Sequence, residues 1–334
     1  MKLKAGVGIN SKLCVGCDDL FFLFSQALSP HLIMHNLDMG IRMSSLAAVR
    51  FLQHDLILVQ FNDPNVGVYH TFYHNSNGGS VFYPSKKNLD SFSILFSNEV
   101  ITHLRLTVHQ DGWLYAIVKV STSENCSKTK NLNLKPSHLL RTKDLIKWEM
   151  LNEIHTEFEE QFDFMIHSLH IDGGYGFYTM PQNGIANSQV CLAFATSPFI
   201  ETVHIEQELI YQQYLPAKNK NNVYYGPTPV RIKEGWLNMV QEIVETSAGV
   251  SLMAKIFWSD SQLLFKVIQQ PKTYLLCKGQ KDWRKHSQML PGCSMWEVNP
   301  SGELVIYMVN FSGQMELSVT KLDDLIDNIR LQYL

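Results

Sequence analysis

The feature that most constrains the fold is a repeat of about sixty residues that runs along most of the chain. Each copy contains a short marker, in which a polar residue stands beside glycine, or in one copy a degenerate equivalent, before apolar or aromatic residues. The five markers are Gln53-His54-Asp55, Asp111-Gly112-Trp113, Asp172-Gly173-Gly174, Glu234-Gly235-Trp236 and Ser301-Gly302-Glu303. Their second residues stand at 54, 112, 173, 235 and 302, so the spacings are 58, 61, 62 and 67 residues. Self-similarity at such a period indicates one supersecondary unit copied several times.

Each marker predicts the turn of a β-hairpin, because glycine adopts the positive φ of a tight turn without strain and Asp tolerates it. Strand-like segments flank the turns, as at Val305–Val309. A second marker closes each unit, as where Thr142-Lys143-Asp144-Leu145 leads to Trp148. Four short strands in each of five units are typical of a five-bladed β-propeller. A β-sandwich with coincidental spacing is the alternative, and the regular copies of both markers disfavour it.

The chain is therefore predicted to be all-β, with a short helix at its C-terminal end, where residues 322–334 have helical apolar spacing. Residues 1–334 form one domain in this reading, with blades that start near residues 43, 101, 162, 223 and 292. Residues 1–40 match the repeat weakly. Cys17-Asp18-Asp19-Leu20-Phe21 resembles a closing marker, so this segment is a candidate to complete the ring and cover an unpaired edge strand. Deleting residues 1–30 should then lower the melting temperature sharply.

Composition excludes several classes of protein. The net charge is −3 and there is no block of Lys and Arg, so we expect no nucleic-acid partner. No stretch approaches the roughly 18 apolar residues of a membrane span, so we expect no membrane partner. A secretory leader is not recognisable, which favours a cytoplasmic location.

Cysteine and histidine patterns predict neither a metal site nor a cofactor. Cys14-Val15-Gly16-Cys17 lacks the second pair of ligands that a structural zinc needs. Even spacing places Asp163 and His167 on one face of a strand but His170 on the other. The six scattered cysteines are interpreted as reduced thiols.

One segment resembles a known family. Residues 224–237, from Tyr224-Tyr225-Gly226-Pro227 to Gly235-Trp236-Leu237, are similar to the Gly-x-x-Pro…Gly-Trp-Leu stretch of glycoside hydrolase family 130. Residues 141–149, 162–181 and 307–325 resemble further motifs of that family, so the similarity covers about 43–327. The family comprises five-bladed β-mannoside phosphorylases and β-mannosidases. The resemblance implies an oligosaccharide or glycoside ligand.

The chain departs from the family at the proton donor. The family's catalytic Asp belongs to a Glu-Asp-Pro-Arg motif, and the matching positions here read Thr102-His103-Leu104-Arg105. His103 stands in place of the acid, and Arg105 is retained. A histidine with its ordinary pKa of about 6.5 could donate a proton near neutral pH, but a lone histidine that faces a channel is more often a hydrogen-bonding or structural residue. Arg105 is either a ligand clamp or the partner of a salt bridge, and Asp163 either contacts the ligand in catalysis or orders a turn.

The chain also departs from the family at the ligand-binding positions. Met180 and Gln241 stand where the family's phosphorylases have a phosphate-binding Arg and His, and Gln60 stands where a first-blade Arg binds sugar. Two missing cations disfavour phosphorolysis. The candidate catalytic residues are accordingly His103 and Asp163. The candidate substrate-binding residues are Arg105, Gln60, Tyr225, Gln241 and Met180.

Two functions remain open at this stage. The first is a carbohydrate-active protein of the glycosidase and glycoside phosphorylase type that hydrolyses or binds glycosides. The second is a catalytically inactive propeller that acts as a sugar-binding or regulatory module. An arabinanase-like glycosidase using Asp55 or Asp63 is weaker, because no partner Glu stands in a convincing motif. Assembly into a homo-oligomer is left open.

Overall fold

The computed structural model describes residues 21–22, 24–27, 42–75, 82–84, 92, 95–96, 99–122, 137–154, 164–168, 175–179, 189–197, 209–216, 223–246, 249–259, 272–278 and 291–330. Within these residues the chain is mostly β-strand, with a short helix, α4 (Leu322–Arg330), after the last strand. The predicted all-β class with a short C-terminal helix is therefore confirmed. No helix within the described residues is long and apolar enough to cross a membrane.

The described strands form five sheets. The first contains β3 (Arg42–Phe51), β4 (His54–Asp63), β5 (Gly67–Asn75) and β6 (Tyr83–Pro84). The second contains β7 (Glu99–Val108), β8 (Leu114–Thr122), β9 (Ser137–Thr142) and β10 (Glu149–Ile154). The third contains β11 (Phe164–Ser168), β12 (Tyr175–Thr179), β13 (Gln189–Ser197) and β14 (Leu209–Pro216).

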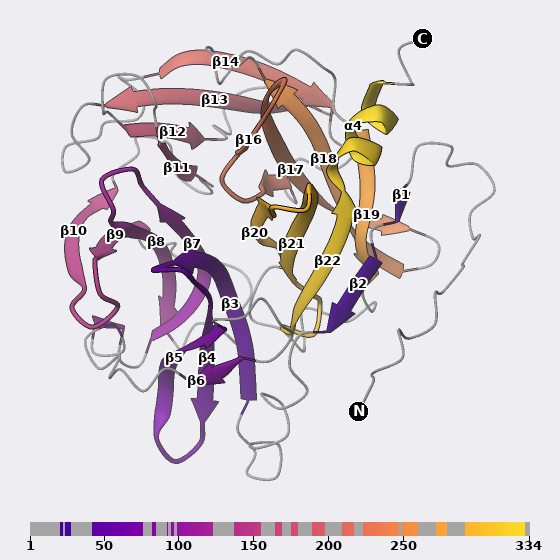
Figure 1. Cartoon of the computed structure of the whole chain (residues 1–334). Coiled ribbons are helices and arrows are strands. Elements are labelled where there is room, and N and C mark those ends of the chain that lie inside the picture. The colour runs from indigo at the N-terminus through magenta and orange to yellow at the C-terminus, as the bar shows by residue number, and fades with distance from the viewer. Residues whose placement is uncertain are drawn as a thin grey trace.

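The fourth sheet contains β15 (Val223–Tyr225), β16 (Val230–Ile232), β17 (Gly235–Thr246), β18 (Gly249–Ser259), β19 (Lys272–Lys278) and β1 (Phe21–Phe22). The fifth contains β20 (Gly292–Val298), β21 (Glu303–Val309), β22 (Met315–Lys321) and β2 (Phe24–Ala27). Figure 1 shows the sheets side by side around a common centre. Strand β3 contacts β7 and β20, and β7 contacts β11, so the first strands of the first, second, third and fifth sheets adjoin those of their neighbours. The fourth sheet contacts the fifth through β16 and β20.

The two N-terminal strands join sheets that the C-terminal half builds. Strand β2 pairs antiparallel with β22, from Phe24 opposite Val319 to Ala27 opposite Glu316. Strand β1 pairs parallel with β19, with Phe21 opposite Tyr274. Of the closing marker predicted at 17–21, only Phe21 lies within the described residues. The effect of removing residues 1–30 stays a prediction.

The hairpin markers adopt the backbone that their residues favour. Gly112, Gly235 and Gly302 have φ of 78°, 146° and 77°. In the degenerate first copy, Leu52 and Gln53 themselves have positive φ of 50° and 65°, between paired strands β3 and β4. Side chains other than glycine, asparagine and aspartate adopt this region at a cost, so the first hairpin is strained relative to the others. The marker at 172–174 lies outside the described residues.

The closing marker of the second sheet shows how neighbouring sheets pack. Asp144 Oδ1 accepts the backbone N–H groups of Ile146 (2.8 Å) and Lys147 (2.9 Å), which forms a tight turn. The turn delivers Trp148 to the first sheet, where its ring stacks on Phe72 with centroids 6.1 Å apart and planes 7° from parallel. The indole is buried in a hydrophobic cluster that both sheets share.

Two more hydrophobic clusters are also shared by neighbouring sheets. One contains residues of the fourth and fifth sheets together with helix α4, and the other contains residues of the first and fifth sheets. Within the described residues, the apolar core thus lies between neighbouring sheets and joins them in the order second, first, fifth, fourth.

Candidate functional site

Four of the seven predicted site residues have described side chains, and all four are buried: Gln60, Arg105, Tyr225 and Gln241. The backbone of His103 lies in β7, directly after a β-bulge, but its side chain is outside the described part of the structure. Asp163 and Met180 also lie outside the described residues.

Arg105 lies on β7, and its side chain leaves the second sheet. Nη2 donates a hydrogen bond to the backbone carbonyl of Tyr225 in β15, and Nη1 donates to the carbonyl of Cys293 in β20, at 3.5 Å. Only 7% of the residue is exposed. The guanidinium therefore connects the second sheet to the fourth and the fifth. Charge-assisted hydrogen bonds of this kind are about twice as strong as neutral ones.

Gln241 lies on β17 and contacts the same two backbone segments. Its Nε2 donates to the carbonyl of Tyr225 at 3.1 Å and, with a longer contact of 3.4 Å, to the carbonyl of Cys293. Its Oε1 accepts the backbone N–H of Cys293. The residue is 0% exposed. Each carbonyl thus accepts from both Arg105 and Gln241, which uses the two lone pairs of each oxygen.

Gln60 occupies a different junction, between the first and second sheets. Its Oε1 accepts the backbone N–H of Ile101 in β7 at 2.9 Å and the Nε2–H of His70 in β5 at 3.1 Å. Burial lowers the pKa of His70 to about 4, so the imidazole is neutral at pH 7. An amide oxygen only accepts, and this assigns the imidazole proton to Nε2.

Gln60 and Gln241 occupy the same position of the repeat, six residues after His54 and six residues after Gly235. Each accepts an N–H from the first strand of the next sheet, immediately before a β-bulge in that strand: Ile101 in one case, Cys293 in the other. A bulge interrupts the ladder and leaves local backbone groups unpaired, and the amide side chain satisfies one of them. A glutamine at the same repeat position in two units is the sequence signal from which this role could have been predicted.

The close packing of the segment after Tyr225 explains why residue 226 is a glycine. Gly226 N donates to Met239 O at 2.9 Å, and a Cβ at residue 226 would lie 2.7 Å from the Met239 Cβ. Thr228 then contacts two other sheets. Its hydroxyl lies 3.1 Å from that of Thr107 in β7, and its carbonyl accepts the indole N–H of Trp296 in β20.

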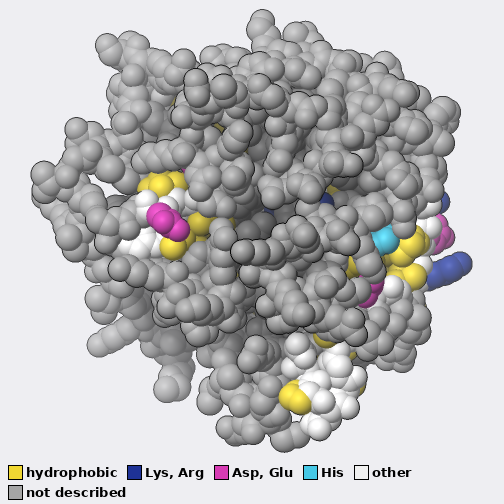
Figure 2. Space-filling view, turned by 180° about the vertical axis from the view of Figure 1, so that it is seen from behind, with side chains coloured by type: hydrophobic (Ala, Val, Ile, Leu, Met, Phe, Trp, Pro, Cys, Tyr) yellow, Lys and Arg dark blue, Asp and Glu magenta, His cyan; other side chains and the backbone are white. Residues whose placement is uncertain are grey.

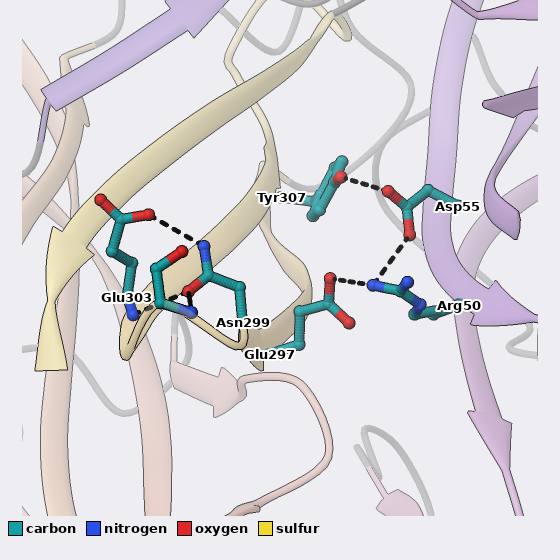
Figure 3. A network of polar contacts seen from close by, with 7 residues as sticks. Arg50, Asp55, Glu297, Asn299, Glu303 and Tyr307 are labelled. Atoms are coloured by element: carbon teal, nitrogen blue, oxygen red, sulfur yellow. Dashed lines mark hydrogen bonds and ion pairs between the residues drawn. The ribbon is translucent and has the colours of Figure 1, made fainter. Parts of the chain in front are cut away.

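A second polar group, which the sequence analysis missed, joins the first and fifth sheets (Figure 3). Arg50 Nη1 lies 2.8 Å from Glu297 Oε1 and 4.0 Å from Asp55 Oδ1, and Tyr307 donates its hydroxyl to Asp55 Oδ2 at 2.9 Å. Burial raises the pKa of Glu297, and Arg50 partly offsets this. Burial and Asp55 raise the pKa of Tyr307. Asp55 therefore does have a neighbouring Glu, but one guanidinium nitrogen holds both carboxylates in an ion network.

The described residues show little sign of metal or thiol chemistry. They contain no group of three or more His, Cys, Asp or Glu side chains that could hold a metal ion. Burial raises the pKa of the Cys293 thiol, so it is protonated at pH 7. On the face seen in Figure 2, the described side chains include hydrophobic ones with acidic and basic side chains beside them.

Comparisons with known proteins place these observations in context. No protein-family model matches the chain. A 4-O-β-D-mannosyl-D-glucose phosphorylase from Bacteroides fragilis is 24% identical over 230 residues, covering 67% of this chain and 58% of that protein. The chain thus spans less than two thirds of the length of this relative.

Two solved structures share the fold. A β-1,2-mannobiose phosphorylase from Listeria innocua has a TM-score of 0.61 and 13% identity, and covers 91% of this chain and 97% of its own. A putative glycoside hydrolase from Bacteroides ovatus has a TM-score of 0.57 and 12% identity, with 84% and 87% covered. The predicted resemblance to glycoside hydrolase family 130 is confirmed.

Proposed function

From this similarity to mannoside phosphorylases of glycoside hydrolase family 130, we propose that the chain is a carbohydrate-active protein built as a closed five-bladed propeller. It binds or hydrolyses a glycoside and does not carry out phosphorolysis. The observation that carries the proposal is the state of Gln241. This residue stands where the resemblance assigns a phosphate-binding His, and both ends of its amide bind backbone groups of Tyr225 and Cys293.

Two arguments support the loss of phosphorolysis. A neutral amide offers an anion no charge, and its donor group already serves two carbonyls. Met180, at the position of the family's second phosphate ligand, is also uncharged. A phosphate in this place would have to break buried hydrogen bonds without gaining an ion pair from either residue.

The closed ring is supported by three features of the described residues. The chain forms five sheets, first strands of neighbouring sheets make contact, and β2 adds a strand to the sheet that ends the chain. In such a ring the first strands surround the channel, which puts Arg105 and the backbone of Tyr225 at its wall.

Hydrolysis in this proposal uses His103 as the proton donor and Asp163 as a polar contact to the sugar. Arg105, Gln60, Tyr225, Gln241 and Met180 are the candidate substrate-binding residues of this proposal, and the first four would have to exchange buried contacts for the sugar. The alternative is a catalytically inactive sugar-binding or regulatory module. One observation favours it: Arg105, the retained family residue, is buried and binds two backbone carbonyls.

The test is a screen of β-mannobioses, mannosyl-glucose and aryl β-mannosides, each with and without inorganic phosphate. Turnover and thermal shift are recorded together. We expect at least one glycoside to raise the melting temperature, with any turnover independent of phosphate. Turnover lost in His103→Ala or Asp163→Ala, but kept in the hairpin-turn control Asp111→Ala, supports hydrolysis. Release of a sugar phosphate would overturn the proposal, and a thermal shift without turnover supports the binding module.

A further inference from the structure

Two side chains, Arg105 and Gln241, join the second, fourth and fifth sheets. We propose that Arg105 and Gln241 form a lock, which holds the first strands of the fourth and fifth sheets against the second sheet, and that the centre opens only when this lock is released. The lock consists of these two side chains and the backbone of Tyr225 and Cys293.

Within the described residues, the apolar core does not make this connection. The described hydrophobic clusters join the second sheet to the first, the first to the fifth, and the fifth to the fourth. Arg105 instead links the second sheet directly to the fourth and fifth, the far members of that series. The lock therefore joins sheets that these clusters do not join directly, and it holds the backbone of two residues, Tyr225 and Cys293, that belong to the cluster of the fourth and fifth sheets.

A second layer lies two residues further along β7. Thr107 is on the same face of the strand as Arg105, and its hydroxyl lies 3.1 Å from the hydroxyl of Thr228. Thr228 in turn accepts the indole N–H of Trp296 in the fifth sheet. The same three sheets thus meet at two successive levels, which shows that the contact of Arg105 is part of a continuous seam.

Buried backbone carbonyls explain why the lock holds. The carbonyls of Tyr225 and Cys293 belong to buried residues, and each has Arg105 and Gln241 as donors. Removing the guanidinium withdraws one donor from each carbonyl at once. Gln241 then remains as the donor to both carbonyls, and the space that the guanidinium leaves beside them is polar, so water can fill it. Opening the lock therefore gives water access to this space.

Cys293 provides a natural reporter of that event. It is 0% exposed, and burial raises the pKa of its thiol, so the closed state reacts slowly with alkylating reagents. The Arg105 charge acts on the thiol in the opposite direction and lowers its pKa. Loss of that charge would by itself slow alkylation, and faster labelling in an Arg105 variant can only report exposure.

The experiment measures the rate at which iodoacetamide labels Cys293 in the folded full-length chain, resolved by peptide mass spectrometry. We expect Arg105→Ala to accelerate labelling at least tenfold, and Arg105→Lys to accelerate it less, because lysine keeps the charge but not the two-pronged donor. Arg141→Ala is the matched control. Arg141 pairs with Glu149 and covers the Trp113 ring, so its loss should leave the Cys293 rate unchanged.

An unchanged labelling rate in folded Arg105→Ala would overturn the lock, as would equal acceleration by Arg141→Ala. Circular dichroism establishes which variants are folded. Should Arg105→Ala fail to fold, Arg105→Lys and Gln241→Met decide the question, since both retain side-chain length. The measurement uses no sugar, so its result tests the lock independently of the proposed function.

Discussion

Gln60 and Gln241 occupy one repeat position, yet the two junctions they serve differ. Both accept an N–H next to a bulge in the following sheet. At Gln60 the remaining contact is local, with His70 of its own sheet. At Gln241 the amide also shares two carbonyls with Arg105, which comes from across the centre. The repeat thus determines where an amide side chain can hydrogen-bond to the next sheet. The neighbouring residues determine whether these hydrogen bonds also involve a third sheet.

Alanine substitutions should separate the two junctions most strongly. In Gln241→Ala, the buried N–H of Cys293 loses its acceptor and two carbonyls lose a donor, so we expect the free energy of unfolding to fall by about 4 kcal/mol. In Gln60→Ala, the N–H groups of Ile101 and His70 lose the one oxygen that both donate to, so we expect the free energy of unfolding to fall by about 2 kcal/mol. Urea midpoints measure both. Equal losses of unfolding free energy in the two variants would show that the hydrogen bonds from Gln241 to the two carbonyls add no stability.

Acid should affect the Gln60 junction through His70. The folded protein holds the pKa of His70 at about 4, whereas the unfolded chain binds a proton near the ordinary value of 6.5. Between these values only the unfolded state takes up the proton, so stability falls as pH decreases from 6.5 to 4, by about 3 kcal/mol in total. Above pH 6.5 the residue contributes no pH dependence.

The measurement is the urea midpoint across this pH range for the natural chain and His70→Gln. The glutamine keeps a donor for Gln60 but does not titrate. We expect the natural chain to lose more stability on acidification than the variant does. Parallel profiles of urea midpoint against pH for the two proteins would show that the acid sensitivity arises from groups other than His70. The Gln60 and Gln241 junctions would then differ only in the geometry of their hydrogen bonds.

The hairpin turns provide the smallest contrast between the same two sheets. Replacing Leu52-Gln53 by Asn-Gly should stabilise the first sheet by about 1 kcal/mol, because both positions have positive φ. Gly235→Ala, in the fourth sheet, should destabilise by about the same amount, because its φ is 146°. Thermal unfolding measures both changes. A destabilised Asn-Gly variant would show that Leu52 or Gln53 makes a contact worth more than the backbone strain.

The sequence predicted the parts of this structure that depend on local chemistry. The markers at Gly112 and Gly302 predicted hairpin turns, and these glycines do have positive φ. Asp111 was expected to belong to a hairpin turn, and its carboxylate accepts the N–H of Trp113 and the hydroxyl of Tyr115. Short-range rules suffice here because the partners are two to four residues apart.

The sequence could not predict the contacts at the centre. Arg105 binds backbone carbonyls, and a carbonyl is present at every residue, so no residue type marks the partner. The resemblance assigned Gln60 and Gln241 to substrate, and that role stays a prediction beside their observed contacts between sheets. The ion network of Arg50 and Glu297 joins residues 247 apart in the chain, and no periodic pattern points to it.

The pairing of β2 with β22 also bears on how the chain folds during synthesis. Phe24 is synthesised 295 residues before its partner Val319 (319 − 24). Until then β2 is a strand without its partner, and such strands invite pairing with other chains. The fifth sheet can be completed only after Val319 is made, so we expect the docking of β2 to be a late step of folding.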